Sequence, residues 1–428
     1  MTGRPFRFAH LADAHVGAWS RDVAVRDALR ESVLRALRTV GERDCDFLLI
    51  SGDLFHTPVP DPAEVAPVAA ALKELVDAGR RIYTIYGSHD YVAHRTSWLD
   101  VLAETGLFLR AAPEAVRAEG DRWTLPYLTD EATGARIAGI SGRSHGLDRS
   151  YFLAVDSEAF RAASGFKIFQ FHAAVEEYLP DHLRPHIRGV SLDDLPGGCD
   201  YYAGGHIHRS YTGKGPGGSG LLVNPGAVFG TAIPDIEDGV AGRSHRGLVI
   251  VEVRDGHPTL EWVETASSIP MKVFDIDVAG RTADAAHSEI QAAVARASTP
   301  GALLFPRVHG TLADGSIGSL GLGHWRADPG RGAASVHWDL ADAQSASPGD
   351  DAFDGDEARL ETDSFHRLSA DDATRLPSLQ GPEGERRLRE LLEALGTPRS
   401  EGEAKADYER LRLLGALHAL GLDPSEAP

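Results

Sequence analysis

Short apolar runs alternate with amphipathic stretches over the first half of the chain. The apolar runs at residues 6–11, 47–50 and 82–85 are typical of buried strands. Apolar positions recur at helical spacing over residues 23–39 and again after Asp61, which predicts a helix in each segment. Because strands and helices alternate, we expect an α/β domain in which helices and sheet form layers.

Strand-like runs dominate the pattern after Leu107. The segments predicted to form strands are residues 123–125, 135–140, 167–171, 201–203, 221–223 and 247–253. A second set of strands after the first predicts two sheets packed face to face, with the helices on the outside. The expected fold class is therefore α/β, as a four-layer α/β/β/α sandwich.

The pattern also predicts where the chain divides. A first domain is expected over residues 1–268, followed by a small α+β unit with a strand–helix–strand pattern over residues 269–335. Acidic residues crowd the stretch that follows, so we expect residues 336–375 to form a solvated linker. Leucines at helical spacing predict two helices in residues 376–428, either folded on their own chain or docked with a partner's helices.

Charge and composition narrow the class of protein. The 428 residues include 43 Lys and Arg and 63 Asp and Glu, which gives a net charge of −20. This excess argues against a chain that coats nucleic acid by charge alone, but it leaves a nuclease open because screened attraction is local. The N-terminus lacks an apolar export region, and no stretch is apolar for long enough to span a membrane. We therefore expect a cytoplasmic protein without membrane contact.

Side chains that bind metals recur at or near the ends of the predicted strands. They are Asp13, His15, Asp53, Ser88, His172, His206 and His208, with His89 beside Ser88. Residues two apart at a strand exit point to one side, so the pairs Asp13/His15 and His206/His208 could each bind one ion. Carboxylates suit divalent cations, and Mn²⁺, Fe²⁺ and Zn²⁺ also accept imidazole. Two ions about 3.5–4 Å apart can hold a phosphate, so the ordered set predicts a two-metal phosphoesterase centre.

Five motifs surround most of these residues. They are His10-Leu11-Ala12-Asp13-Ala14-His15-Val16-Gly17, Ser51-Gly52-Asp53-Leu54-Phe55-His56, Gly87-Ser88-His89-Asp90, Gly205-His206-Ile207-His208 and Asn224-Pro225-Gly226. Together they resemble the motifs of the calcineurin-like metallophosphoesterase superfamily and, within it, those of the SbcD-type nucleases of DNA double-strand-break repair. The resemblance covers residues 6–264, and residues 271–312 resemble the capping domain of these nucleases.

The resemblance implies a role for each position. One metal ion would bind Asp13, His15, Asp53 and His208. A second would bind Asp53, Ser88, His172 and His206. His89 would stabilise the developing charge or protonate the leaving oxygen, and His56 would contact the substrate phosphate.

The resemblance also implies an activity, cofactors and partners. The activity is that of a DNA exonuclease and endonuclease in double-strand-break repair. The cofactors are two divalent metal ions, with Mn²⁺ as the expected metal. The partners are DNA ends, an SMC-like coiled-coil ATPase subunit of the SbcC type, and a second copy of the chain in a homodimer.

One position departs from the family pattern. Ser88 stands where these nucleases have asparagine in a Gly-Asn-His-Asp motif. A serine hydroxyl is shorter and a poorer neutral ligand than an amide oxygen, so the second ion would bind more weakly or the metal preference would change. Two alternatives stay open: a small-molecule or general phosphodiesterase of the same fold, and a non-catalytic scaffold with a degenerate metal site.

Overall fold

The computed structural model describes residues 4–90, 96–112, 123–142, 148–181, 183–185, 187–266, 269–320, 322, 332–345, 381–396 and 405–420. Contacts divide the chain into two compact units. The first comprises Met1–Ala279, Ala285–Gly310 and Leu322–Ala343, and the second comprises Gly280–Asp284, Thr311–Gly321 and Gln344–Pro428. Within the described ranges, no helix is both long and apolar enough to cross a membrane.

The first sheet is built around the strand at the start of the chain. Its six strands follow the order β14-β13-β1-β2-β3-β4. Their bounds are β1 (Phe6–Leu11), β2 (Phe47–Ser51), β3 (Arg81–Ile85), β4 (Leu109–Arg110), β13 (Gly247–Arg254) and β14 (His257–Glu264). Strands β1 to β4 are parallel, whereas β13 runs antiparallel to both β1 and β14. The three strands predicted before residue 90 are confirmed.

The second sheet also has six strands, in the order β11-β12-β10-β9-β7-β6. Their bounds are β6 (Leu128–Thr129), β7 (Arg136–Ile140), β9 (Lys167–Phe171), β10 (Tyr201–Ala203), β11 (Tyr211–Lys214) and β12 (Leu221–Asn224). The four central strands are parallel, and the two edge strands β11 and β6 are antiparallel to their neighbours. A separate pair consists of β5 (Trp123–Thr124) and β8 (Val155–Asp156).

Large aromatic side chains fill the space between the two sheets. The Phe8 ring stacks on Phe47 with the ring centroids 5.0 Å apart. It also meets Tyr201 of the second sheet edge-on, with the centroids 5.1 Å apart. All three side chains are fully buried, and their burial removes a large apolar area from water. Because both sheets contribute to this core, the sheets pack face to face as predicted.

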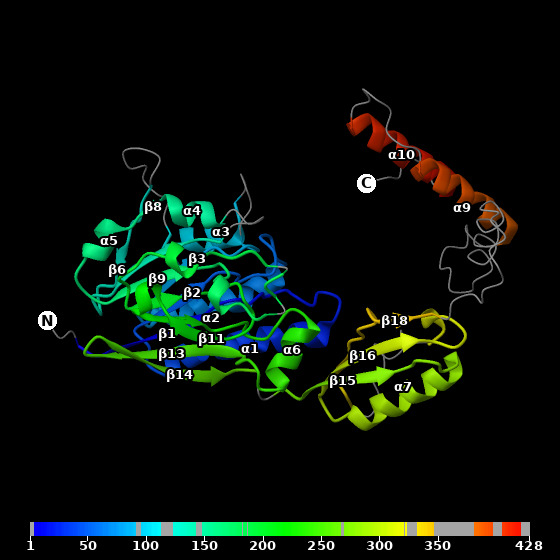
Figure 1. The fold of residues 1–428 in the computed structure, drawn as a ribbon, viewed down its shortest axis with the longest axis horizontal. Coiled ribbons are helices and arrows are strands. Elements are labelled where there is room, and N and C mark those ends of the chain that lie inside the picture. Colours follow the sequence, from blue (N-terminus) through cyan, green and yellow to red (C-terminus); the bar gives the residue numbers. More distant parts are fainter. Residues whose placement is uncertain are drawn as a thin grey trace. The chain divides into compact units, whose positions relative to one another are not determined.

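Helices form the two outer layers (Figure 1). The first sheet's outer face packs against α1 (Val23–Glu42), α2 (Pro62–Asp77), α3 (Trp98–Glu104) and α6 (Ile233–Val240). The second sheet's outer face packs against α4 (Asp148–Ala154) and α5 (Glu158–Ala162). The predicted four-layer α/β/β/α arrangement is therefore confirmed.

Aspartates cap α1 and α2, the two long helices on the outer face of the first sheet. Asp22 Oδ1 accepts a hydrogen bond from Val25 N at 3.2 Å, and Asp61 Oδ1 accepts one from Ala63 N at 2.9 Å. These bonds satisfy amides that have no partner inside the helix. The helix predicted after Asp61 is confirmed, and the helix predicted over residues 23–39 continues to Glu42.

A third sheet follows in the sequence. It contains β15 (Met271–Asp277), β16 (Leu303–Thr311), β17 (Ser335–Val336) and β18 (Ala343–Gln344), and helix α7 (Ala283–Ala297) connects the first two strands. Leu303 and Phe305 of β16 are buried in the same core as the outer face of the first sheet. The strand–helix–strand pattern predicted here is confirmed, whereas the boundary at residue 268 stays a prediction.

Two helices, α9 (Gly381–Gly396) and α10 (Lys405–Leu420), form a hairpin. Arg387 Nη1 donates to Leu420 O at 3.3 Å, and Arg412 Nη1 donates to Ala394 O at 2.8 Å. These two contacts give an antiparallel pairing, as expected for helices folded on their own chain. Most of the segment predicted to be an acidic linker lies outside the described residues.

Candidate metal centre

The side chains predicted to bind metals converge where parallel strands end. Loops after β1, β2 and β9 carry Asp13, Asp53 and His172, and the loop after β10 carries His206 and His208. Backbone hydrogen bonds join the first two loops, with Asp13 N 3.1 Å from Gly52 O and His15 N 2.9 Å from Asp53 O. Residues distant in sequence therefore meet at the carboxyl ends of the parallel strands of both sheets.

Two groups of donor atoms share Asp13. One group is Asp13, His15 and His208, and the other is Asp13, Asp53 and His172, with the ligand atoms of each group within 4.8 Å of one another. Asp53 Oδ2 lies 3.6 Å from His15 Nε2 and 3.2 Å from His172 Nε2, so Asp53 stands between the two groups. This is the position that a bridging carboxylate needs.

His206 and Ser88 lie beside these groups, and His206 belongs to no group of three His, Cys, Asp or Glu donors found among the described residues. The His206 ring centroid is 5.2 Å from that of His172, and its backbone N donates to the Asp13 carboxylate at 3.0 Å. Ser88 Oγ donates to Asp53 Oδ2 at 3.4 Å. Metal ligation by either side chain stays a prediction.

The donor set fits a divalent cation. His15 Nε2 and His208 Nε2 face each other at 3.1 Å, an arrangement that two neutral acceptor nitrogens avoid unless a proton or a cation lies between them. His172 Nε2 is buried 3.2 Å from the Asp53 carboxylate, so a proton or a cation belongs between these two groups. Carboxylate and imidazole donors together are typical of Mn²⁺, Fe²⁺ and Zn²⁺ sites.

Backbone strain is concentrated in the same loops. Four ligand candidates have positive φ, namely Asp13 (51°), His15 (46°), Asp53 (53°) and His206 (92°). A non-glycine residue in this region costs about 1–2 kcal/mol, and such residues cluster at functional sites. Gly52 and Gly87 leave the space that this geometry requires, because a Cβ at either position would overlap His172 or Asp53.

Buried hydrogen bonds fix the orientation of the ligands. His172 Nδ1 donates to Ser51 O at 2.8 Å, which turns Nε2 toward the carboxylates. The Asp90 carboxylate accepts bonds from Asp53 N at 2.7 Å and Gly87 N at 3.0 Å. Asp90 therefore holds the loops after β2 and β3 together.

A second set of supporting residues was not predicted from the sequence. His208 Nδ1 lies 2.8 Å from Asp235 Oδ2, and Arg246 Nη1 donates to His208 O at 2.6 Å. Asn224 Nδ2, in a motif noted above, donates to Ile207 O at 2.6 Å and so holds the same loop. Asp235 lies in a helix too short to give a clear periodic signal, which hid its role.

His10 forms buried hydrogen bonds with two polar side chains behind the metal centre. Its Nδ1 lies 3.0 Å from Tyr201 Oη, and its Nε2 lies 3.0 Å from Ser51 Oγ. Burial lowers the pKa of His10 to about 3, so the ring is neutral. His10 is thus a core residue that supports the Ser51 loop.

Burial and neighbouring charges shift several pKa values in the centre. Burial opposes ionisation of Asp53, yet His172 and His15 outweigh it and hold the pKa of Asp53 below its usual range. Burial raises the pKa of Asp13. Burial and the charge on His172 lower the pKa of His206 to about 3. Asp53 is therefore an anion and His206 a neutral ring, the forms in which both offer lone pairs.

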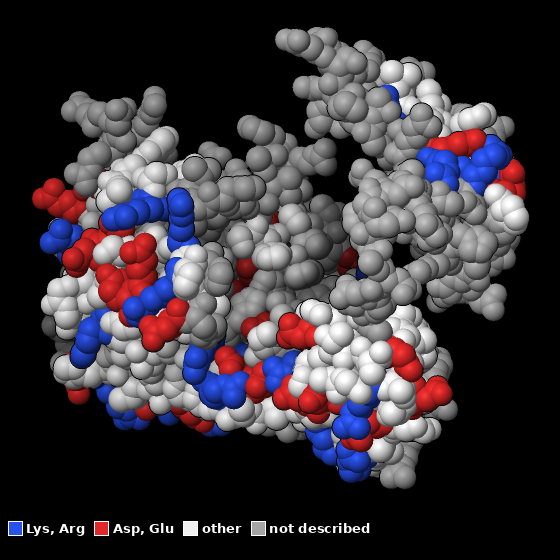
Figure 2. Space-filling view, turned by 45° about the vertical axis from the view of Figure 1, so that its right-hand side comes forward, with Lys and Arg blue, Asp and Glu red and all other residues white. Residues whose placement is uncertain are grey.

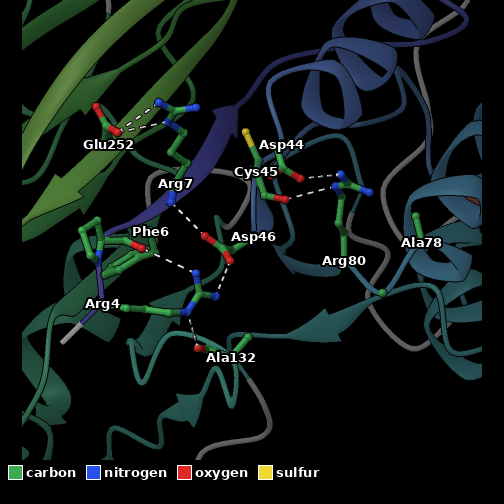
Figure 3. Close-up of a pocket in the computed structure, with 12 residues that line it drawn as sticks. Arg4, Phe6, Arg7, Asp44, Cys45, Asp46, Ala78, Arg80, Ala132 and Glu252 are labelled. Carbon is green, nitrogen blue, oxygen red and sulfur yellow. Dashed lines mark hydrogen bonds and ion pairs between the residues drawn. The ribbon is translucent and has the colours of Figure 1, made fainter.

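A separate hollow of about 360 Å³ lies at the opposite ends of the strands (Figure 3). Arg4 pairs with Asp46 at 2.5 Å, and Arg7 pairs with Glu252 at 3.1 Å. Arg80 pairs in the same way with Asp44. Each guanidinium in the hollow is neutralised by a carboxylate, so these contacts stabilise the fold there.

Comparisons with known proteins agree with this geometry. Residues 6–210 match the family described as calcineurin-like phosphoesterase. Three archaeal proteins, each named DNA double-strand break repair protein Mre11, are similar to this chain. The protein of Methanopyrus kandleri is 27% identical over 285 residues, 63% of this chain and 59% of the relative.

The other two relatives are similar over shorter segments. The protein of Methanococcus maripaludis is 24% identical over 54% of this chain and 59% of the relative. The protein of Archaeoglobus fulgidus is 27% identical over 47% of this chain and 46% of the relative. The chain therefore spans less than two thirds of the length of each relative.

Replacing Asp235 with asparagine should weaken cation binding. The carboxylate accepts the proton of His208 Nδ1 and so leaves Nε2 as the acceptor in the centre. We expect Asp235→Asn to lower the affinity for Mn²⁺ by about 10–100-fold, as measured by titration calorimetry. Asp277→Asn is a matched control, because Asp277 also lies beside a histidine, His309, outside the centre. Equal affinities of Asp235→Asn and the wild type would contradict the role of Asp235.

Cation binding should release a proton from His172. Burial opposes a charge on this ring, but Asp53 and Asp13 raise its pKa to about 10, so at neutral pH a cation must displace a proton from it. The affinity for Mn²⁺ should therefore increase with pH, by up to about tenfold per unit below this pKa. Calorimetry in buffers of different ionisation enthalpy counts the released protons.

The raised pKa of His172 also makes the stability of the fold without a cation depend on pH, in the opposite direction to the affinity for Mn²⁺. Because the pKa of His172 in the folded chain lies above the ordinary histidine value of 6.5, protonation stabilises the fold fully below pH 6.5. This stabilisation is lost as the pH rises toward about 10. A Mn²⁺ affinity that does not change with pH would show that His172 is not displaced.

Proposed function

We propose that this chain is a metal-dependent nuclease that hydrolyses phosphodiester bonds in DNA. The match of residues 6–210 to the calcineurin-like phosphoesterase family supports this proposal. The observation that carries the proposal is the convergence of two donor groups around Asp13 and Asp53. The similar archaeal proteins, named for DNA double-strand break repair, support DNA as the substrate.

The proposed cofactors are two divalent cations, with Mn²⁺ as the expected metal. The first would be held by Asp13, His15, Asp53 and His208, and the second by Asp53, Ser88, His172 and His206. Bound divalent cations polarise a phosphate oxygen and lower the pKa of water. The chain itself supplies the fixed carboxylates and imidazoles that hold this charge at one edge of the sheets.

His89 is the proposed proton donor to the leaving oxygen. Its backbone N donates to Asp53 Oδ1 at 2.8 Å, which ties the residue to the metal centre. Its ring Nδ1 lies 2.8 Å from His56 O, and because a carbonyl only accepts, Nδ1 carries a proton. The ring can therefore donate from Nε2 only in its cationic form, which is the form a general acid needs.

His56 is the proposed contact to the substrate phosphate. Its ring stacks on that of His89 with the centroids 5.1 Å apart, and both rings lie within 6 Å of the His15 ring. Burial and the neighbouring His89 lower the pKa of His56. A neutral His56 would bind a phosphate oxygen through an N–H donor rather than through charge.

The proposed substrate is a DNA end, and the proposed partners are an SMC-like coiled-coil ATPase and a second copy of the chain. On the face drawn in Figure 2, Lys and Arg side chains of the described residues lie among Asp and Glu side chains. A strongly acidic chain cannot attract DNA through its net charge. Local contacts and a partner that presents the DNA end would therefore have to supply the binding.

Ser88 favours one alternative, a non-catalytic scaffold. Its hydroxyl is 3.4 Å from Asp53 Oδ2, and it replaces the amide that the resemblance leads us to expect. Against this alternative, the donor groups contain Asp13, His15, Asp53, His172 and His208, and His206 and His89 lie beside them. A scaffold needs only one ion or none, so the number of Mn²⁺ ions bound per chain separates the two possibilities.

The purified chain should degrade end-labelled DNA in the presence of Mn²⁺. Asp53→Asn should abolish cleavage, because Asp53 contacts both donor groups. His89→Gln should slow cleavage by about 10²–10⁴-fold, the usual contribution of a general acid. The measurement is the rate of nucleotide release on a sequencing gel.

An exposed histidine outside the centre provides the control. His257→Gln, at the start of β14, should cut DNA at the wild-type rate. Undiminished cleavage by Asp53→Asn would refute the site. Hydrolysis of bis-nitrophenyl phosphate or cyclic nucleotides without cleavage of DNA would instead favour a small-molecule phosphodiesterase.

Restoring the amide at position 88 should strengthen binding of the second ion. Ser88→Asn adds a carbonyl oxygen on a longer side chain next to Asp53. We expect the affinity for the second Mn²⁺ ion to increase by about threefold or more, since a better ligand typically contributes about 1 kcal/mol. Calorimetry gives the affinity, and Ser88→Ala should bind no more tightly than the wild type.

A further inference from the structure

We propose that Arg307, on strand β16 of the third sheet, positions the metal ligand His208 through helix α6. This inference rests on the proposed function only in taking His208 as a ligand of the first cation. Arg307 would touch neither the cation nor the substrate, so it would be a positioning residue. Two sets of contacts link Arg307 to His208 through α6, and a third set joins the third sheet to the loop that carries Asp13 and His15.

The first set of contacts joins His208 to the start of α6. Asp235, in the first turn of this helix, receives His208 Nδ1 at 2.8 Å and the backbone N of Thr231 at 2.8 Å. Arg246 bonds to the carbonyls of both His208 and Asp235. The direction of the His208 ring therefore depends on where the first turn of α6 lies.

The second set of contacts joins α6 to the third sheet. Glu237, two residues after Asp235, forms an ion pair with Arg307 at 2.7 Å. Arg307 Nε also bonds to Asp275 Oδ1 at 2.8 Å, and Asp275 is its partner in the register of β15 and β16. The guanidinium is therefore held by its own sheet while its other end fixes α6.

The third set of contacts concerns the loop that carries the other two ligands of the same donor group. After Asp13 and His15, Trp19 packs edge-on against the ring of His337 with the centroids 4.8 Å apart. Asp22 accepts a hydrogen bond from Ser335 Oγ at 2.6 Å. The third sheet thus contacts both chain segments that supply Asp13, His15 and His208, one of the donor groups described above.

Whether removal of Arg307 weakens or strengthens cation binding distinguishes a positioning role from a purely electrostatic one. Removing a positive charge near a cation site should strengthen cation binding if only the charge matters. If Arg307 acts by holding α6, its removal should weaken binding instead. Because Arg307 and Glu237 are both about 30% exposed, with side-chain values of 32% and 30%, the expected effect is modest.

The test measures Mn²⁺ binding to the full chain by titration calorimetry, without DNA. Arg307→Gln should weaken binding at the first site by about three- to tenfold, and Glu237→Gln should do the same. The double variant should bind no more weakly than the weaker of the single variants, because both changes break the Glu237–Arg307 pair that joins α6 to β16. In the Asp235→Asn background, Arg307→Gln should have no further effect, since the link to His208 is already broken.

Arg296→Gln is the matched control. Arg296 pairs with Glu289 at 3.2 Å on α7, so its removal costs a similar ion pair without contact to α6. It should bind Mn²⁺ as the wild type does. Arg307→Lys keeps the charge without the planar fork and should fall between the wild type and Arg307→Gln.

The outcomes are distinct. If Arg307→Gln lowers the unfolding temperature but leaves Mn²⁺ affinity unchanged or increases it, Arg307 is only structural and the proposal fails. If Arg307→Gln does not fold, Arg307→Lys decides instead, because it keeps the charge: weaker Mn²⁺ binding than the wild type supports the positioning role, and wild-type affinity overturns it. If the wild type binds Mn²⁺ and the variants weaken it, but no DNA is cut, the nuclease function fails while the positioning role stands. If the wild type binds no Mn²⁺, both fail.

Discussion

The close approach of two buried carboxylates, Asp13 and Asp53, is the constraint on which the centre depends. Both side chains are almost fully excluded from water, where like charges repel most strongly. The fold opposes this repulsion with backbone donors, because His206 N points at Asp13 and His89 N points at Asp53. Imidazoles stand close to both carboxylates as well. A divalent cation would neutralise the carboxylates and accept the lone pairs of the imidazoles.

The two sheets supply the rigidity that this arrangement needs. Parallel strands end at one edge, so short loops can bring distant ligands together without long connections. Those loops are strained at four ligand positions, and buried bonds from Asp90, Ser51 and Asn224 hold them in place. The strain is therefore offset by contacts that contribute nothing to ligation directly. Preorganisation of this kind spares the protein from reordering its ligands when a cation binds.

Much of this could be predicted from the sequence, for identifiable reasons. Strands such as β1, β2 and β9 are rich in apolar residues, and a residue of the centre follows each strand within two positions, namely Asp13, Asp53 and His172. Strand β14 was missed because it is an edge strand with mostly exposed or half-buried side chains. Helix α6 was missed because it has only eight residues and contains Pro234 and Gly239. The roles of Asp235 and Asp90 depend on tertiary contacts, which local patterns do not encode. Which ligand binds which ion stays a prediction.

The pairing of β1 with β13 has a consequence for the order of synthesis. The match to the phosphoesterase family ends at residue 210, yet the first sheet is completed only by residues 247–264. A nascent chain that has left the ribosome only as far as His208 holds every ligand candidate, but one edge of β1 is still without its neighbour. An unpaired, apolar strand edge invites pairing with another chain. A fragment cut at the end of the family match would therefore be prone to aggregate.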